Sequence, residues 1–208
     1  MKEVNPEIIK YITDEIIPLY NNFDPAHKES HVISVLNAAL EMTRHYDVDK
    51  DMIAVAAAFH DLGLSEDRAE HHLISGRIIR ETENLQKWFT PEQIETIAQA
   101  AEDHRASSDH EPRSLYGRII AEADRQIIPE TVILRTIQFS LAHYPQLDKE
   151  GHWHRTVEHL HEKYAEGGYL KLWIPESANA DKLKRLREII RDEEKLRGIF
   201  EKLFETLR

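Results

Sequence analysis

The sequence predicts an all-α protein, and three features of its pattern lead to this fold class. Apolar residues recur at helical spacing in one segment after another along the chain. Residues that start helices stand where these segments begin, as Thr90 does before Pro91. Only Gly167–Pro175, bounded by a Gly-Gly pair and a proline, has the character of a short extended segment.

The expected helices follow one another with short polar breaks between them. They cover residues 6–20, about 24–46, 50–62, 69–83, 91–104, 114–124, 131–143, 150–164 and 179–208. The last helix carries many charges and an apolar stripe, which suits packing or the formation of a homodimer. No internal repeat or flexible linker interrupts the chain. We therefore expect one domain over residues 1–208, a helical bundle with a motif-bearing core at about 24–130 and a C-terminal helical extension at about 150–208.

Composition and charge exclude several classes of function. The net charge is −11, which disfavours long nucleic acids and membranes because both are bound mainly through Lys and Arg. No stretch approaches the ~20 apolar residues that span a bilayer, and the polar N-terminus lacks a signal-peptide core, so we expect a cytoplasmic protein. Cysteine is absent, so any metal site must use His, Asp or Glu.

The run Ala54–Gly63 is the centre of the sequence pattern. A helix that is apolar on every face must be buried, so it carries His60 and Asp61 into the interior. Gly63 is expected to end this helix in the left-handed conformation. The buried pair could bind a transition metal or simply bond backbone carbonyls, and the rest of the chain has to decide between these.

Two further polar residues lie on apolar helix faces. His31 shares a face with Val35, and Asp124 shares one with Tyr116 and Ile120. An aspartate there is costly unless it is paired or ligated. Together with the central pair, these residues make two imidazoles and two carboxylates. This donor set suits Mn²⁺, Fe²⁺, Co²⁺, Ni²⁺, Zn²⁺ or Mg²⁺, with positions left open for water and substrate.

The order His, His-Asp, Asp across a helical chain resembles the HD-domain superfamily of metal-dependent phosphohydrolases. The resemblance spans about residues 24–129, with Asp24-Pro25-Ala26-His27 similar to the family's helix entry and Ala121–Arg125 similar to the segment of its last aspartate. It implies that the metal ligands are His31, His60, Asp61 and Asp124. Leu64 stands where the branch that hydrolyses cyclic dinucleotides has lysine, and the Gly-Tyr-Pro motif of that branch is missing.

Some branches of the family hold a second metal through extra histidines, and His72 and His104 are similar to these in placement. Each sits at an inward helical position, where a hydrogen-bonded core histidine is the alternative. If a second ion binds, Asp61 is the natural bridge and the ions should lie about 3.5–4 Å apart.

The resemblance implies hydrolysis of a phosphoester or phosphoanhydride in a small molecule, with nucleotides as the leading class. One or two divalent ions would activate water and polarise the phosphoryl group. Asp61 or Glu66 would orient or deprotonate the water. The expected contacts to substrate phosphate are His27, Lys28, Arg77, Arg105 and Arg125.

Two other functions stay open. A di-iron oxygenase would use His72 and His104 for a second iron, whereas a binding or regulatory module would hold only a structural metal. We also expect the segment from His152 to Pro175, with its four histidines near the start, to lie peripheral to the metal as surface, wall or lid.

Overall fold

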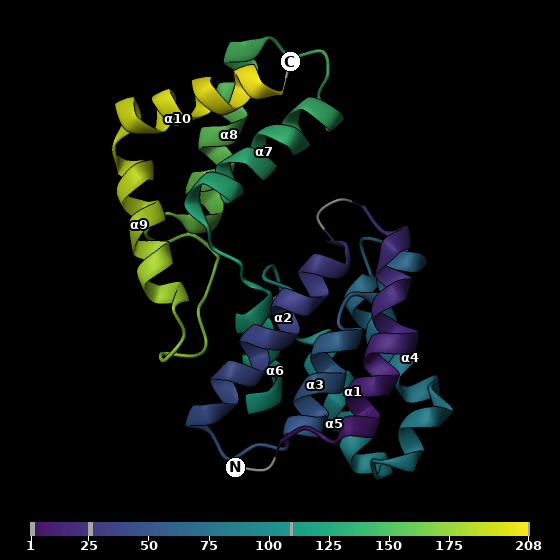
Figure 1. Cartoon of the computed structure of the whole chain (residues 1–208). Helices are drawn as coiled ribbons and strands as arrows, with labels where there is room; N and C mark the ends of the chain where they lie inside the picture. The colour runs from purple at the N-terminus through teal and green to yellow at the C-terminus, as the bar shows by residue number, and fades with distance from the viewer. Residues whose placement is uncertain (1–2, 25–26, 109, 208) are drawn as a thin grey trace. The chain divides into compact units, whose positions relative to one another are not determined.

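The structure, a computed structural model, describes residues 3–24, 27–108 and 110–207 (Figure 1). Across these residues it contains ten α-helices and no strand, which confirms the all-α prediction. Contacts divide the chain into two compact units, Met1–Arg125 with Trp173–Ser177, and Gln126–Leu172 with Ala178–Arg208. The expectation of a single domain stays a prediction.

Helix α3 is the centre of the first unit. The α-helices of this unit are α1 (Pro6–Tyr11), α2 (Glu29–Met42), α3 (Lys50–Phe59), α4 (His71–Glu81), α5 (Pro91–Glu102) and α6 (Leu115–Asp124). Helix α3 packs against α1, α2, α5 and α6. Every residue of α3 from Asp51 to Phe59 is buried, as its uniformly apolar run predicts. The end of α3 therefore places His60 and Asp61 inside the unit.

The N-terminal helix keeps the predicted start but changes its winding. Helix α1 is followed by a π-helical stretch, Ile12–Ile16, and then by 3₁₀ turns over Ile17–Asn22. Pro18 has no backbone N–H, so the regular α-helical ladder cannot continue through it.

Gly63 does not have the predicted left-handed conformation. Among the residues described, only Gly167 has a positive φ, of 86°. Gly63 lies in the 3₁₀ turn Leu62–Ser65, where its N–H donates to the Ser75 hydroxyl at 2.9 Å. A Cβ at this position would stand 2.0 Å from the carbonyl oxygen of His71. Glycine is therefore needed here because the first turn of α4 lies directly against it.

The extended segment expected near Pro175 forms no strand with any described residue. The end of this segment lies in the stretch Trp173–Ser177, which belongs to the first unit. There the buried carboxylate of Glu122 on α6 binds it through hydrogen bonds. Glu122 accepts hydrogen bonds from the backbone N–H of Trp173 at 2.6 Å and of Ile174 at 3.4 Å, and from the Ser177 hydroxyl. A buried carboxylate is stable here because these donors replace water.

The second unit is built from the helices α7 (Pro129–His143), α8 (Lys149–Tyr164), α9 (Asn179–Arg191) and α10 (Glu193–Thr206). Helix α7 packs against the other three. The single C-terminal helix expected over 179–208 is wrong, because the chain breaks at Asp192. The Asp192 side chain accepts a hydrogen bond from the N–H of Lys195 and so caps a new helix.

One histidine of the group before Gly167 is placed differently from the sequence-based expectation. His152 is buried in the second unit, 2.8 Å from the Ser140 hydroxyl through Nδ1, rather than lying at the surface. Across the described part of the chain, no helix is both long and apolar enough to cross a membrane.

Candidate metal centre

Six metal-binding side chains come together in the first unit as two groups of three. The first group is His31, His60 and Asp124, and the second is Asp61, His71 and His104. In each group, one donor atom per residue lies within 4.8 Å of the others. They come from separate elements: the first turn of α2, the ends of α3, α5 and α6, and the first turn of α4.

The first triad meets where α2, α3 and α6 converge. Its three donor atoms are the Nε2 atoms of His31 and His60, which lie 3.3 Å apart, and Oδ1 of Asp124. The Asp124 oxygen is 3.3 Å from the His31 nitrogen and 3.7 Å from the His60 nitrogen. Asp124 is the last residue of α6 and is half-buried, whereas the side chains of His31 and His60 are buried.

The second triad lies beside the first and shares Asp61 with it. The Nε2 atoms of His71 and His104 are 3.1 Å apart, and Oδ1 of Asp61 lies 3.6 Å and 3.4 Å from them. The other oxygen of Asp61, Oδ2, faces the first triad at 3.3 Å from His31 Nε2 and 3.2 Å from His60 Nε2. Each oxygen of this buried carboxylate therefore faces a different triad.

Backbone carbonyls orient three of the four imidazole rings. The Nδ1 atoms of His60, His71 and His104 lie 2.8, 2.8 and 2.6 Å from the carbonyl oxygens of the residues three positions earlier. A carbonyl oxygen only accepts, so each Nδ1 carries the proton and donates it. In the neutral rings, Nε2 then directs its lone pair into the centre. Histidine ligands of metals are typically held in this way.

The donor geometry fits a divalent cation. Two ligands that share a metal at about 2.1 Å stand about 3.0–3.4 Å apart, which is close to the separations within each triad. In the second triad, the Nε2 atoms of His71 and His104 and one carboxylate oxygen of Asp61 face the same volume, and each of them can accept a hydrogen bond or bind a cation. Such acceptors repel one another unless a cation or a proton lies between them. The residues therefore fit the metal that the His/Asp chemistry implies.

The side chains of the centre shift one another's pKa values. Burial lowers the pKa of His60, but the charges and hydrogen bonds of Asp61 and Asp124 outweigh this effect and hold it well above its ordinary value. Burial raises the pKa of both aspartates, and the surrounding histidines more than reverse that and hold it well below the usual range. Burial and the neighbouring His104 lower the pKa of His71 to about 4. Ionised aspartates and a neutral His71 are the states that bind metals.

The structure brings His31, His60, Asp61, Asp124 and His104 together, but it replaces His72 by His71. The expected helix begins at Ala69 and puts His72 inward, whereas α4 begins at His71. A side chain in the first turn leans toward the helix N-terminus, which here faces Asp61. His72 lies one position further round, with its ring 5.6 Å from that of His71. No signal in the sequence distinguishes His71 from His72, because the close approach of Gly63 to this turn is a contact of the folded chain.

Several predicted catalytic and phosphate-binding residues have other partners. Glu66 is paired with Arg77 at 2.6 Å on the surface, so the structure does not bring either residue to the centre. Lys28 donates to the carbonyl of Asn21. His27 lies closer, with its ring 5.5 Å from that of His31.

The other two predicted phosphate contacts lie beside ligands. Arg105 donates to the carbonyl of Ala69, two residues before His71. Arg125 follows Asp124 and is buried, and its Nε and Nη1 atoms have no hydrogen-bond partner among the described residues. The resemblance of Asp24-Pro25-Ala26-His27 to a helix entry falls partly on Pro25 and Ala26, which lie outside the described residues.

A helical bundle with two His/Asp triads in its interior gives this chain a candidate metal centre of the histidine–aspartate type. Residues 29–126 match the family model of the HD domain, and this segment includes all six side chains of the centre. For residues 29–126, this match confirms the resemblance to the HD domain that the sequence indicates.

The fold is also similar to a solved structure. It matches a predicted HD superfamily hydrolase from an uncultured Thermotogales bacterium, whose crystal structure was determined at 1.45 Å resolution. The TM-score is 0.50 and the sequence identity is 21%, over 73% of this chain and 82% of that chain. No curated protein matches this sequence.

Proposed function

We propose that this protein is a metal-dependent phosphohydrolase that acts on a small phosphorylated molecule, with nucleotides as the leading substrate class. The observation that carries the proposal is the shared carboxylate of Asp61, which faces one His/Asp triad with each oxygen. This is the arrangement expected of a residue that bridges two ions. The name of the structurally similar protein, a predicted hydrolase, agrees with this reading.

The six side chains would bind two ions. One ion would be held by His31, His60 and Asp124, the other by His71 and His104, with Asp61 between them. Divalent ions bound there would lower the pKa of a coordinated water and polarise a phosphoryl oxygen of the substrate.

The roles of the remaining residues follow from their surroundings. Because the pKa of Asp61 is held well below its ordinary range, we assign it to ligation and orientation rather than to proton abstraction. Glu66 has no support as the base, since its carboxylate pairs with Arg77. Arg125, buried next to Asp124, is the strongest of the predicted phosphate contacts because its guanidinium has donors to spare.

The test is the substitution Asp61→Ala, measured by metal content and by hydrolysis of a panel of nucleotides and phosphoesters. We expect the variant to fold, to lose both ions and to lose turnover, since it removes a ligand from both triads. Asp47→Ala changes an exposed aspartate of the same unit and is the matched control, so it should keep its metal content and its turnover. If Asp61→Ala kept its metal and its full hydrolytic rate, the proposed centre would be wrong.

The second triad also supports the di-iron oxygenase as a second candidate, with His71 rather than His72 as the ligand of the second iron. The iron-loaded protein distinguishes the two functions. An iron charge-transfer band together with oxygen uptake would favour the oxygenase, whereas phosphate release without oxygen uptake would favour the hydrolase.

A further inference from the structure

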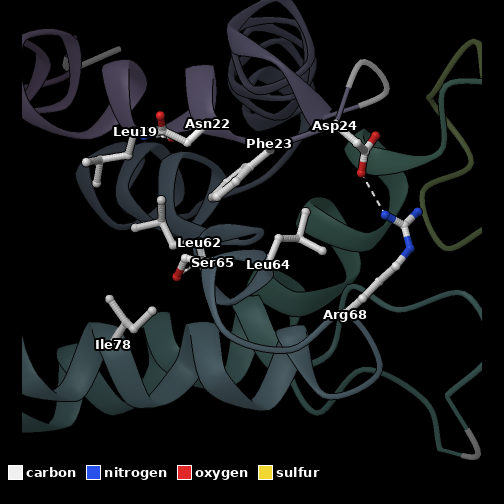
Figure 2. A pocket seen from close by; sticks show the side chains of 9 residues that line it. All are labelled: Leu19, Asn22, Phe23, Asp24, Leu62, Leu64, Ser65, Arg68 and Ile78. Atoms are coloured by element: carbon white, nitrogen blue, oxygen red, sulfur yellow. Dashed lines mark hydrogen bonds and ion pairs between the residues drawn. The ribbon is translucent and has the colours of Figure 1, made fainter.

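A hollow of about 480 Å³ lies in the first unit, and one of its lining residues, Leu62, follows Asp61 in the chain. Figure 2 shows its walls, which come from three elements: the end of the N-terminal helix, the turn after Asp61, and α4. The apolar walls are Leu19, Phe23, Leu62, Leu64 and Ile78. None of the six side chains of the centre lines this hollow.

Three connections join the hollow to the centre. Leu62 follows Asp61 directly in the chain. Arg68 lines the hollow with its side chain, while its backbone carbonyl accepts the hydrogen bond that orients His71. Asp24 also lines the hollow, and its carboxylate oxygen lies 2.9 Å from Nδ1 of His27. The ring of His27 in turn contacts the ring of His31.

A charged pair marks one end of the hollow. The guanidinium of Arg68 donates to Asp24 at 2.6 Å, as the dashed line in Figure 2 shows. A guanidinium has five N–H groups, so Arg68 retains donors for a second anionic partner. The Asp24 and Arg68 pair is also the part of the lining that is linked to the centre, through His27 and through the backbone carbonyl that orients His71.

The rest of the hollow combines apolar walls with a few polar atoms. The Ser65 hydroxyl donates to the carbonyl of Leu62 and keeps lone pairs to accept a hydrogen bond. Asn22 adds an amide, and the ring of Phe23 adds an aromatic surface. A pocket of this volume, mostly apolar with a few polar groups that fix orientation, is typical of sites for small organic ligands.

We propose that this hollow binds the nucleobase of a nucleotide substrate, and that Arg68 contacts the phosphate between the hollow and the metal centre. This inference rests on the proposed function and names the substrate class. A nucleobase is flat, largely apolar on its faces and polar at its edge. It therefore fits walls of leucine, isoleucine and phenylalanine that carry one amide and one hydroxyl.

The first experiment measures binding of the four ribonucleosides, which lack phosphate, by calorimetry. We expect at least one to bind the wild-type protein and to bind Ile78→Trp at least ~10-fold more weakly, because the larger ring fills the hollow. Leu73→Trp changes an exposed leucine of the same helix that does not line the hollow, so it should bind as the wild type does. If Ile78→Trp does not fold, Leu19→Trp fills the hollow from a residue that is 45% exposed.

The second experiment tests Arg68. Arg68→Met should weaken binding of the nucleoside monophosphate several-fold and leave binding of the nucleoside unchanged. Arg44→Met removes another exposed arginine, which pairs with Glu41, and should change neither.

The outcomes separate this inference from the proposed function. Equal nucleoside binding by wild type and the filled variants, or no binding of any nucleoside, would overturn the assignment of the hollow. Hydrolysis of inorganic tripolyphosphate without nucleoside binding would uphold the proposed function and overturn the inference. Nucleoside binding that the filled variants lose, without hydrolysis of any phosphoester, would uphold the hollow and contradict the hydrolase.

Discussion

At the scale of single residues, the neighbours His71 and His72 differ sharply in their surroundings. The Nε2 atom of His71 lies 3.1 Å from that of His104, and its Nδ1 donates to the carbonyl of Arg68. His72 lies outside both triads. Successive residues of a helix point in directions that differ by about 100°, so His71 can face the triad while His72 points elsewhere.

This difference predicts the metal content of two matched variants. His71→Ala should lose one equivalent of metal, because it removes a ligand of the second triad only. His72→Ala should keep both equivalents. Elemental analysis of the purified proteins after loading with Mn²⁺ is the measurement. Loss of an equivalent from His72→Ala, with none from His71→Ala, would show that the triad is assigned to the wrong histidine.

The pKa shifts at the centre predict a pH dependence of stability. With metal chelated, protonated His60 and His31 have pKa values raised above the ordinary value of 6.5. Their contribution to stability is complete below about pH 6.5 and is lost as pH rises through the raised values. The aspartates, with lowered pKa values, contribute at every pH above about 4.

We therefore expect the Tm of the chelated protein to fall as the pH rises above about 6.5, while the rise in Tm on adding Mn²⁺ grows over the same range. The metal takes the place of protons on the imidazoles, so its binding tightens as protons become scarce. Thermal unfolding with and without chelator measures both. A stabilisation by Mn²⁺ that shrinks with rising pH would contradict the proposed ligands.

At the scale of elements, the second triad depends on how closely α4 approaches the turn after α3. Gly63 makes this approach possible, because any Cβ there would collide with the backbone of His71, and its N–H is tied to Ser75 on the same helix. His71 and Ser75 are four residues apart, so both lie on one face of α4. The position of a metal ligand is thus set by a glycine eight residues earlier.

Gly63→Ala should displace the first turn of α4. We expect a loss of about 1–3 kcal/mol in stability from overpacking, together with loss of the second metal equivalent while the first is retained. Denaturant unfolding and elemental analysis measure the two effects. Gly198→Ala is the control, because a Cβ there meets no atom within 4 Å and alanine favours a helix. Unchanged stability and metal content in Gly63→Ala would refute this role.

At the scale of the whole molecule, the net charge of −11 limits the partners of the centre. A small phosphorylated molecule at the proposed centre would meet only local charges, those of the bound ions and of a few arginines, whereas a long polyanion would meet the field of the whole surface.

We therefore expect no binding of duplex DNA even at low salt, under conditions in which the proposed hydrolysis of small phosphorylated molecules is measured. Fluorescence anisotropy with a labelled duplex is the measurement, and hydrolysis in the same buffer is the control. DNA binding that weakens steeply with added salt would show instead that a local basic surface outweighs the net charge.

The sequence by itself determined the all-helical fold, the burial of the His60 and Asp61 pair, and the inward positions of His31, Asp124 and His104. Both helical periodicity and the burial of a polar residue on an apolar face depend on residues close together in the chain. The spacing of apolar and polar residues in the sequence therefore predicts them. Helical periodicity did not predict features that depend on the exact residue at which a helix starts or breaks. It placed the start of α4 two residues early and missed the break at Asp192.

Only the tertiary structure decided which histidine completes the second triad, how Asp61 lies between the two triads, and that Glu66 turns away to Arg77. These features depend on contacts between elements that are distant in the chain, such as Gly63 against His71 and the end of α5 against Asp61. A spacing pattern records which face of a helix a residue occupies. It does not record how closely two helices approach, and that distance decides which side chains can share a metal ion.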